Sequence, residues 1–291
     1  MNGLEERIRV AAQNFFTNGY AVIESFLSEN DITDIKKEIN NLIHESTKEE
    51  KRNIFGNDFN VKNHYFLDSA NKIGYFHEKH AIDQDTGEFL LPIDRTLSKI
   101  GHALHYLNPV FHKYTNNDKV RLIFKEINFT EPTVTQSMVI FKNPKIGAEY
   151  TPHQDASFIR TEPEIRLVGF WIALDDATPE NGCLQFIPGS HKWELKRRFV
   201  LTGKDEGELI TWTTPEVKYE DNQFVQVPVK KGSLVLIHGL VVHRSARNMS
   251  DSPRWAYTFH SFDDTEKSRY SKDNWLQIRD GQNTFMKIIE N

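Results

Sequence analysis

The first third of the chain shows helical periodicity. Apolar side chains at three- and four-residue intervals predict a helix over residues 1–17, ended by Asn18-Gly19, and then a short strand over 20–24. Ser28, with Asp31 three residues later, has the form of a capping box and predicts the start of a second helix. Two further helices are expected over 95–107 and 117–127. The first two helices should bury Leu4, Ile8, Ala11, Ala12 and Phe15, and Ile32, Ile35, Ile39, Leu42 and Ile43.

Residues 46–92 lack a sustained period and begin with the charged run 48–52. A long irregular segment within a compact protein is usually functional or disordered. Tyr65, Phe66, Tyr75 and Phe76 argue against disorder, because disordered segments are poor in aromatic residues. We therefore expect a wall or lid over a pocket, with a surface excursion as the alternative.

After Pro132 the pattern changes to short β-rich runs separated by turn signals. Such a pattern predicts a sandwich or barrel. We predict a mainly β fold with α: a double-stranded β-helix (jelly-roll, cupin-like) core over about 131–265, buttressed by a helical N-terminal part over about 1–130. No linker is evident, so a single domain over 1–291 is expected. The strand candidates are 133–141, 166–174, 183–187, 224–227, 233–237 and 254–259, and the turn signals include Asn181-Gly182, Pro188-Gly189 and Lys231-Gly232.

Composition narrows the class of protein. An apolar share of 38% and a charged share of 26% are those of a soluble globular protein. The net charge of −5 gives no general attraction to nucleic acid or anionic membranes, so neither is predicted as a partner. The N-terminal residues lack the apolar region of a secretory signal, and no apolar run approaches the length of a membrane span. The C-terminal residues do not form a peroxisomal signal. A cytoplasmic location is therefore expected. The single cysteine, Cys183, excludes an internal disulfide and is expected in the core.

One short motif carries candidate metal chemistry. His153 and Asp155 are two residues apart, so in an extended segment they point to the same side. A histidine and a carboxylate, joined by one distant histidine, make the facial triad of non-haem Fe(II) oxygenases. The pair alone occurs by chance, but Pro152 fixes an extended backbone just before it.

Two downstream histidines could complete the triad. His243 follows Val-Val on an expected strand, whereas His238 precedes a glycine turn, and we favour His243. Arg254 follows at the start of an apolar-rich strand. Arginine binds carboxylates through a bidentate fork that lysine cannot form. Taken alone, however, Arg254 is better explained as a surface charge at the start of a strand.

With these residues in place, the chain resembles the phytanoyl-CoA dioxygenase family of Fe(II)- and 2-oxoglutarate-dependent oxygenases. The similarity covers nearly the whole chain, and its motifs are specific in combination rather than singly. They are His153-Gln154-Asp155, the segment 176–184 with Asn181-Gly182-Cys183, Pro188-Gly189-Ser190-His191, Gly232-Ser233-Leu234-Val235-Leu236, the segment from His243 to Arg254, Asn71-Lys72-Ile73, and the segment 99–105.

The resemblance implies a role for each site residue. His153, Asp155 and His243 would hold Fe(II). Arg254 would bind the distal carboxylate of the cosubstrate 2-oxoglutarate, with O2 as the oxidant. The remaining candidates are cosubstrate contacts or neighbours of the pocket: Ser245 and Lys99 beside Arg254, Met138 and Trp171 in the pocket wall, Gln136 as a weaker candidate, and His191 as a packing element of the family rather than a ligand.

The predicted function is an Fe(II)- and 2-oxoglutarate-dependent dioxygenase that forms succinate and CO2 and hydroxylates an unidentified small organic molecule. One alternative is a cupin-like metalloenzyme that does not use 2-oxoglutarate, since two histidines and an aspartate can also hold zinc. The other is a non-catalytic jelly-roll binding protein. Arg254 argues against the first alternative and the intact triad against the second.

The substrate and the oligomeric state are left open by the sequence. The family name suggests an acyl-CoA, whose phosphates would need a basic rim. Lys196-Arg197-Arg198 is the only dense basic run.

Overall fold

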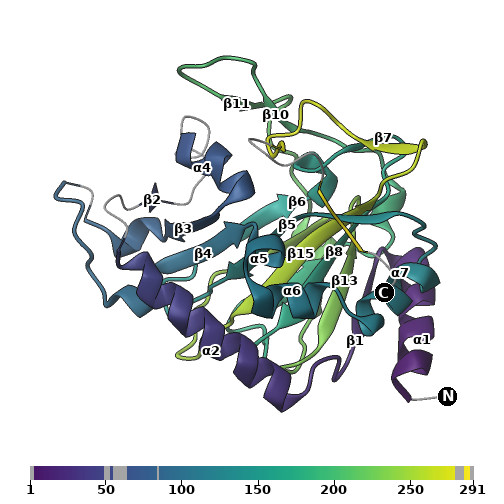
Figure 1. Cartoon of the computed structure of the whole chain (residues 1–291), viewed down its shortest axis with the longest axis horizontal. Helices are drawn as coiled ribbons and strands as arrows, with labels where there is room; N and C mark the ends of the chain where they lie inside the picture. The colour runs from purple at the N-terminus through teal and green to yellow at the C-terminus, as the bar shows by residue number, and fades with distance from the viewer. Residues whose placement is uncertain (1–2, 49–52, 55–63, 84, 279–284, 289–291) are drawn as a thin grey trace.

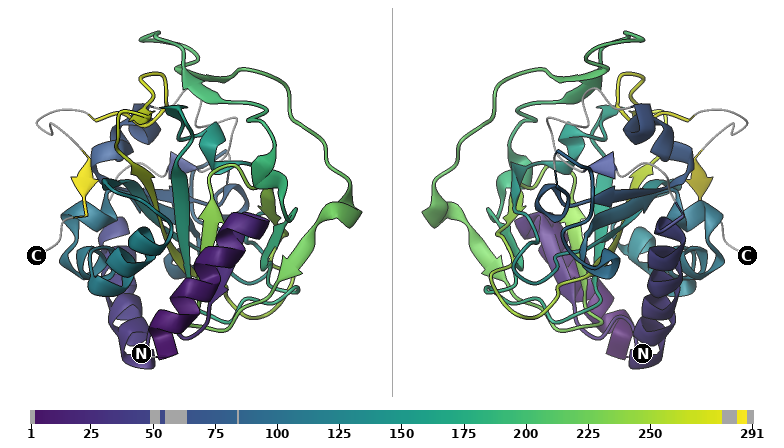
Figure 2. Two further views of the ribbon diagram at one scale, coloured as in Figure 1. Left: turned by 90° about the vertical axis from the view of Figure 1, so that its right-hand side faces the viewer. Right: turned by 90° about the vertical axis from the view of Figure 1, so that its left-hand side faces the viewer.

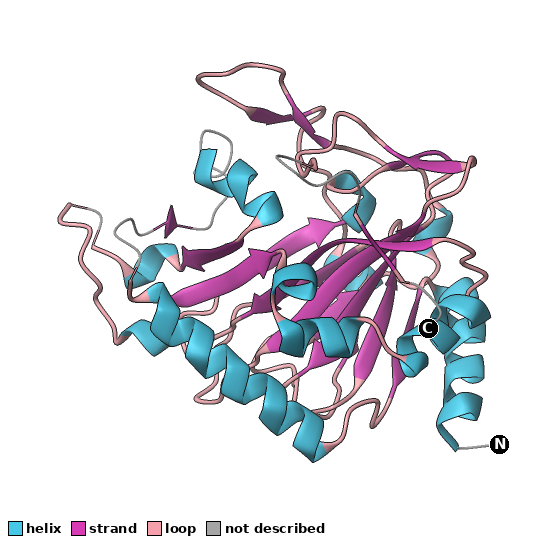
Figure 3. Ribbon diagram, in the orientation of Figure 1, coloured by secondary structure: helices cyan, strands magenta, loops and turns pink. Residues whose placement is uncertain are grey.

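The computed structural model describes residues 3–48, 53–54, 64–83, 85–278 and 285–288, and most of its regular structure is β (Figures 1 and 3). Its centre is a nine-stranded sheet, ordered β1-β13-β8-β15-β5-β4-β3-β2, with β17 pairing with β5. In the same order the strands are β1 (Tyr20–Ile23), β13 (Leu234–His238), β8 (Leu167–Ala173), β15 (Ala256–Asp263), β5 (Pro132–Ile140), β4 (Leu97–His102), β3 (Ile73–His77), β2 (Asn53–Ile54) and β17 (Met286–Lys287).

A smaller, four-stranded sheet faces the large one and is ordered β12-β9-β14-β6. Its strands are β12 (Val225–Val227), β9 (Leu184–Phe186), β14 (His243–Ser245) and β6 (Tyr150–His153). Two strand pairs stand apart, β10 (Phe199–Leu201) with β11 (Ile210–Trp212), and β7 (Thr161–Pro163) with β16 (Ser268–Tyr270). Apart from β2, which pairs with β3 in parallel, the strands of the two facing sheets are antiparallel. This is the predicted double-stranded β-helix, and the predicted fold class is confirmed.

Most of the helices cover the outer face of the large sheet, while the small sheet covers its inner face (Figures 1 and 2). The short helix His64–Asp68 instead lies on the inner side, where its Phe66 packs against Trp275. The helices are α1 (Gly3–Asn18), α2 (Glu29–Ser46), α4 (His64–Asp68), α5 (Leu104–Leu107), α6 (Pro109–Thr115) and α7 (Asp118–Glu126). None of the helices in the described ranges has the length and apolar character needed to cross a lipid bilayer.

Strand β8 shows how this layering follows from sequence. Every residue of β8 is buried. Phe170 and Ile172 pack into the core under the helices, whereas Trp171 and Ala173 pack into the core between the sheets. A strand buried on both faces reads as a continuous apolar run, because neither alternating set of side chains meets water.

The first two helices form as predicted. The buried residues of α1 are Ile8, Ala11, Ala12 and Phe15. In α2, the Asp31 main-chain N–H donates to Ser28 Oγ at 3.2 Å, and the Ser28 N–H donates to Asp31 Oδ2 at 2.9 Å. These two bonds are the predicted capping box. The helix predicted over 117–127 is α7.

The helix predicted over 95–107 is wrong in its first half. Residues Leu97–His102 form strand β4, and only Leu104–Leu107 is helical. β4 lies between β3 and β5, and all six of its residues are buried. Leu97, Ile100 and Leu104 fit helical spacing, but pairing on both edges of the strand decides its conformation. Tertiary context overrides local pattern here.

Candidate active site

The three predicted metal ligands come together between the sheets. His153 ends β6, His243 begins β14, and the two are register partners in that antiparallel pair. Asp155 follows in the short 3-10 turn Asp155–Ser157. Its Oδ1 lies 3.6 Å from Nε2 of His153 and 3.6 Å from Nε2 of His243. Within the described ranges this is the group of histidine and acidic side chains spaced to share one metal ion.

Both histidines are oriented by their other ring nitrogen. Nδ1 of His153 lies 2.7 Å from the Thr151 carbonyl oxygen, and Nδ1 of His243 lies 3.1 Å from the Val241 carbonyl oxygen. A carbonyl accepts only, so each Nδ1 carries the proton and each Nε2 lone pair is free to join Asp155 Oδ1 in binding one metal ion. Burial lowers the pKa of His243 to about 4, which keeps this ring neutral as metal ligation requires. The donor set therefore fits Fe(II).

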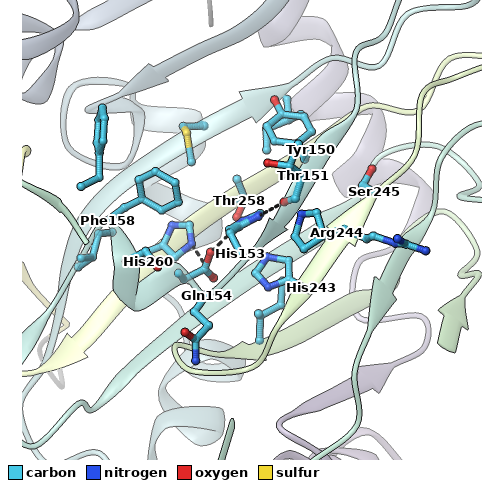
Figure 4. Close-up of a pocket in the computed structure, with 18 of the residues that line it drawn as sticks. Tyr150, Thr151, His153, Gln154, Phe158, His243, Arg244, Ser245, Thr258 and His260 are labelled. Carbon is cyan, nitrogen blue, oxygen red and sulfur yellow. Dashed lines mark hydrogen bonds and ion pairs between the residues drawn. The ribbon is translucent and has the colours of Figure 1, made fainter. Parts of the chain in front are cut away.

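A third histidine, His260 on β15, lies beside His153 in the cavity (Figure 4) and contacts the other oxygen of Asp155. Its Nε2 lies 3.2 Å from Asp155 Oδ2. Burial raises the pKa of the Asp155 carboxyl, but the surrounding histidines His243, His260 and His153 together lower it by more, and the net pKa is well below its usual range. Gly169 makes room for this contact, because a Cβ there would lie 3.1 Å from Asp155 Oδ2.

The Gln136 side chain supports the His260 ring from the side opposite Asp155. The Gln136 side-chain amide lies behind the ring, with Nε2 3.3 Å from His260 Nδ1. If the amide N–H donates to Nδ1, then Nε2 of His260 carries the proton and turns it to Asp155. The sequence analysis missed His260, although alternation from Thr258 along β15 would place it on the cavity face.

Arg254 is fully buried, and among the residues that the structure describes it has no acidic partner. Its Nη2 donates to Ser245 Oγ at 3.2 Å, and its guanidinium lies 5.2 Å from the centre of the Trp171 ring. Its Nε makes no hydrogen bond, and no ion pair joins it to a carboxylate of the described residues. Burial lowers its pKa to about 10, so it stays charged at neutral pH. Such a charge calls for a bound anion.

The other predicted cosubstrate contacts share this cavity. Thr258 pairs with Met138 on one side and Trp171 on the other, so the three lie at one level of the large sheet. Lys99 is buried, with Nζ 3.0 Å from His102 Nε2. Burial lowers the pKa of Lys99 well below its usual range. A carboxylate nearby would favour its charged form.

The remaining histidine candidates lie outside the cluster. His238 Nδ1 accepts a bond from the Leu240 N–H at 3.1 Å, and its ring packs on Phe15. His191 reaches the Phe16 carbonyl oxygen through Nε2 at 3.0 Å. The preference for His243 over His238 therefore agrees with the geometry, and His191 is a packing residue, as expected.

The cavity has a volume of about 550 Å³ and is lined by the triad, Lys99, Met138, Trp171, Ser245 and Arg254. The described part of 46–92 supplies one wall through Phe66 and Glu78. Phe66 is buried and stacks on Trp275, 4.3 Å between ring centres. This agrees with the predicted wall; residues 49–52, 55–63 and 84 of that prediction lie outside the described residues.

The family can now be tested by comparison. The sequence model described as phytanoyl-CoA dioxygenase (PhyH) matches residues 15–256. The chain belongs to the phytanoyl-CoA dioxygenase family. Phytanoyl-CoA dioxygenase domain-containing protein 1 of Danio rerio is 44% identical over 272 residues, covering 91% of this chain and 93% of its own. Its Caenorhabditis elegans homologue is 43% identical, covering 91% and 94%. The Arabidopsis thaliana phytanoyl-CoA dioxygenase is 40% identical, covering 90% and 91%.

Solved structures share the fold at low identity. The non-haem α-ketoglutarate-dependent epimerase SnoN of nogalamycin biosynthesis has a TM-score of 0.64 and 15% identity, covering 98% of this chain and 97% of its own. EctD from S. alaskensis, with 2-oxoglutarate and 5-hydroxyectoine, has a TM-score of 0.59 and 18% identity, covering 90% and 78%. Family membership and the His–Asp–His cluster together confirm the predicted 2-oxoglutarate-dependent dioxygenase with Fe(II) as its metal.

Proposed function

We propose that this dioxygenase couples the breakdown of 2-oxoglutarate to the hydroxylation of a small organic molecule held in the cavity. In the balanced reaction, 2-oxoglutarate, O2 and a substrate C–H give succinate, CO2 and a substrate C–OH. One oxygen atom enters succinate and the other enters the product. The observation that carries the proposal is a buried Arg254, with no carboxylate partner among the described residues, in the same cavity as a three-ligand metal cluster.

Each side chain has a separate task in this proposal. His153, Asp155 and His243 hold Fe(II), which when bound supplies the activation of O2. Arg254 grips the distal carboxylate of 2-oxoglutarate, with Ser245 beside it and Lys99 on the same cavity wall. Met138 and Trp171 flank the cosubstrate and exclude water from it. The protein thereby orients the reactants, while the metal carries the oxidative chemistry.

The test is an assay for succinate formation. Wild type should convert 2-oxoglutarate only with Fe(II). Asp155→Ala should nearly abolish turnover, because it removes the anionic ligand. Arg254→Leu should raise the KM for 2-oxoglutarate at least tenfold, about 1.4 kcal/mol, and leave the Fe(II) affinity unchanged. Arg254→Lys keeps the charge but not the bidentate fork, so its KM for 2-oxoglutarate should lie between those of wild type and Arg254→Leu.

Three results would contradict parts of the proposal. Full activity of Asp155→Ala, with unchanged metal content, would overturn the triad. A KM for 2-oxoglutarate within about threefold of wild type in Arg254→Leu would show that Arg254 is not the anchor. Metal-dependent turnover of a substrate without consumption of 2-oxoglutarate would favour the cupin-like alternative.

A further inference from the structure

A second arginine in the cavity wall, Arg197, also has no acidic ion-pair partner in the described part of the chain. Its guanidinium carbon lies 3.6 Å from the centre of the Trp212 ring. Its Nε is buried without a hydrogen bond, and no carboxylate of the described residues forms an ion pair with it. Arg197 and Trp212 line the same cavity as the metal cluster. Arg197 therefore holds a partly buried positive charge in place on an aromatic face.

Two neighbouring arginines, in contrast to Arg197, do have acidic partners. Arg198 forms an ion pair with Asp273, and its Nη1 donates to Asp273 Oδ2 at 2.7 Å. Arg244 donates from Nη1 to Asp221 Oδ1 at 2.6 Å and from Nε to Gln185 at 2.9 Å. Of the three, only Arg197 leaves its hydrogen-bonding edge unused within the described chain.

An aromatic path joins Arg197 to the metal ligands. Phe158 lies edge-on to the His153 ring at 5.8 Å and to Trp212 at 5.3 Å between ring centres. Phe199, on β10, closes the same wall and lies 4.9 Å from Trp212. The β10–β11 pair that carries Phe199 and Trp212 lies at the same end of the molecule as α4 and β7 (Figures 1 and 2). A molecule on this wall would have an apolar surface between a cation and the metal cluster.

We propose that the primary substrate is an organic acid whose carboxylate binds Arg197 and whose apolar body lies along Phe158, Phe199 and Trp212. The oxidised C–H then lies at the end of the molecule remote from the acid group. This inference rests on the proposed function for the reaction, but the binding site stands on geometry alone. The guanidinium is stacked on Trp212, so the edge that remains is the planar fork that matches one carboxylate.

The charges around Arg197 favour a single carboxylate over the several phosphates of a coenzyme A. Lys196 is the neighbouring cation of the basic run that also lines the cavity. Of the acidic residues that line the cavity, Glu216 is the one whose charge acts on Arg197. Burial lowers the pKa of Arg197 and the exposed Glu216 raises it, yet the two side chains form no ion pair. Arg198 and Arg244 are already paired with Asp273 and Asp221, so of these three arginines Arg197 is the one whose fork is open to a ligand. One open fork matches one carboxylate, whereas the several phosphates of a coenzyme A would call for more.

The experiment measures binding to the Fe(II) enzyme, without O2, at saturating 2-oxoglutarate so that Arg254 is occupied. The probes are octanoate and 4-phenylbutyrate, their primary amides, and octanoyl-CoA, followed by calorimetry. In wild type at least one acid should bind at least tenfold more tightly than its amide. Arg197→Gln should reduce this preference to within twofold, Arg197→Lys should retain part of it, and the dissociation constant of 2-oxoglutarate should stay within twofold in both variants. Lys204→Gln, which removes an exposed charge from the β10–β11 turn, is the matched control and should keep the full preference.

Four outcomes would overturn the inference: binding of neither acid, equal binding of acids and amides, a preference that survives Arg197→Gln, or octanoyl-CoA binding tenfold more tightly than octanoate. The last would assign the site to acyl-CoAs. Failure of the proposed function would look different: acid binding would depend on Arg197, yet succinate formation would not depend on Asp155.

Discussion

At the scale of single residues, the His153-Gln154-Asp155 motif does not reveal the side chains that hold the Asp155 carboxylate in position. One carboxylate oxygen faces the two ligand histidines, and the other faces His260 at 3.2 Å. Gln136 in turn contacts the far side of the His260 ring at 3.3 Å. A ligand carboxylate held at one oxygen presents the other in a fixed direction, and such supports tune metal affinity.

We therefore expect His260→Ala to weaken Fe(II) binding about 10- to 100-fold, because Asp155 loses the group that orients it. At saturating iron the KM for 2-oxoglutarate should stay within twofold, since His260 is placed to act through the metal ligand. His260→Gln retains an N–H donor and should recover part of the affinity. Anaerobic titration with Fe(II) gives the dissociation constant. An affinity in His260→Ala equal to wild type would show that the contact is structural only.

At the scale of elements, α2 contributes to the stability of the fold but lies away from the cavity. Its buried face, including Ile32, Ile35 and Ile39, packs into the core on the helix side of the large sheet. The cavity lies on the opposite face, between the sheets. A change at the exposed start of α2 can therefore alter the free energy of unfolding while the site keeps its geometry.

Ser28→Ala should lower the free energy of unfolding by about 1 kcal/mol, because it removes the acceptor for the Asp31 N–H at the start of α2. Urea denaturation measures the change. Ser28→Thr keeps a capping oxygen and serves as the control. The KM for 2-oxoglutarate and the turnover should match wild type in both variants. A loss of activity without a loss of stability would contradict the separation of helix layer and site.

At the scale of the whole molecule, burial of neutral histidines links stability to pH. Burial lowers the pKa of His238 to about 4. An unfolded chain has a histidine pKa near 6.5, so below that pH the unfolded state takes up a proton that the native state refuses. This contribution to stability is complete above about pH 6.5 and is lost as the pH falls toward 4.

His238→Gln should make the stability of the metal-free protein less dependent on pH. Glutamine can still accept the bond from the Leu240 N–H, which is 3.1 Å in wild type, but it does not titrate. Between pH 6 and 4.5 the free energy of unfolding of wild type should fall more steeply than that of the variant, by about 1.4 kcal/mol per pH unit. Urea denaturation at several pH values measures both slopes. Parallel curves would show that His238 does not carry this proton linkage.

The sequence by itself determined the features that depend on near neighbours in the chain. The buried faces of α1 and α2 and the capping box of α2 follow from local spacing. The turns at Gly182, Gly189 and Gly232 follow from the freedom of glycine to adopt positive φ, here +83°, +80° and +83°. His153 and Asp155 could be recognised as a pair from their spacing alone, because side chains two residues apart in an extended segment point to the same side.

Only the tertiary structure decided the features that depend on distant partners. β4 is a strand because β3 and β5 pair with both of its edges, although its apolar spacing also fits a helix. His260 reaches Asp155 because β15 and β8 bring it opposite Gly169, where a missing Cβ leaves space. Among the described residues, no acid pairs with Arg197, whereas Asp273 and Asp221 fold against its neighbours Arg198 and Arg244. Burial and pairing are properties of the assembled sheets, and no local pattern encodes them.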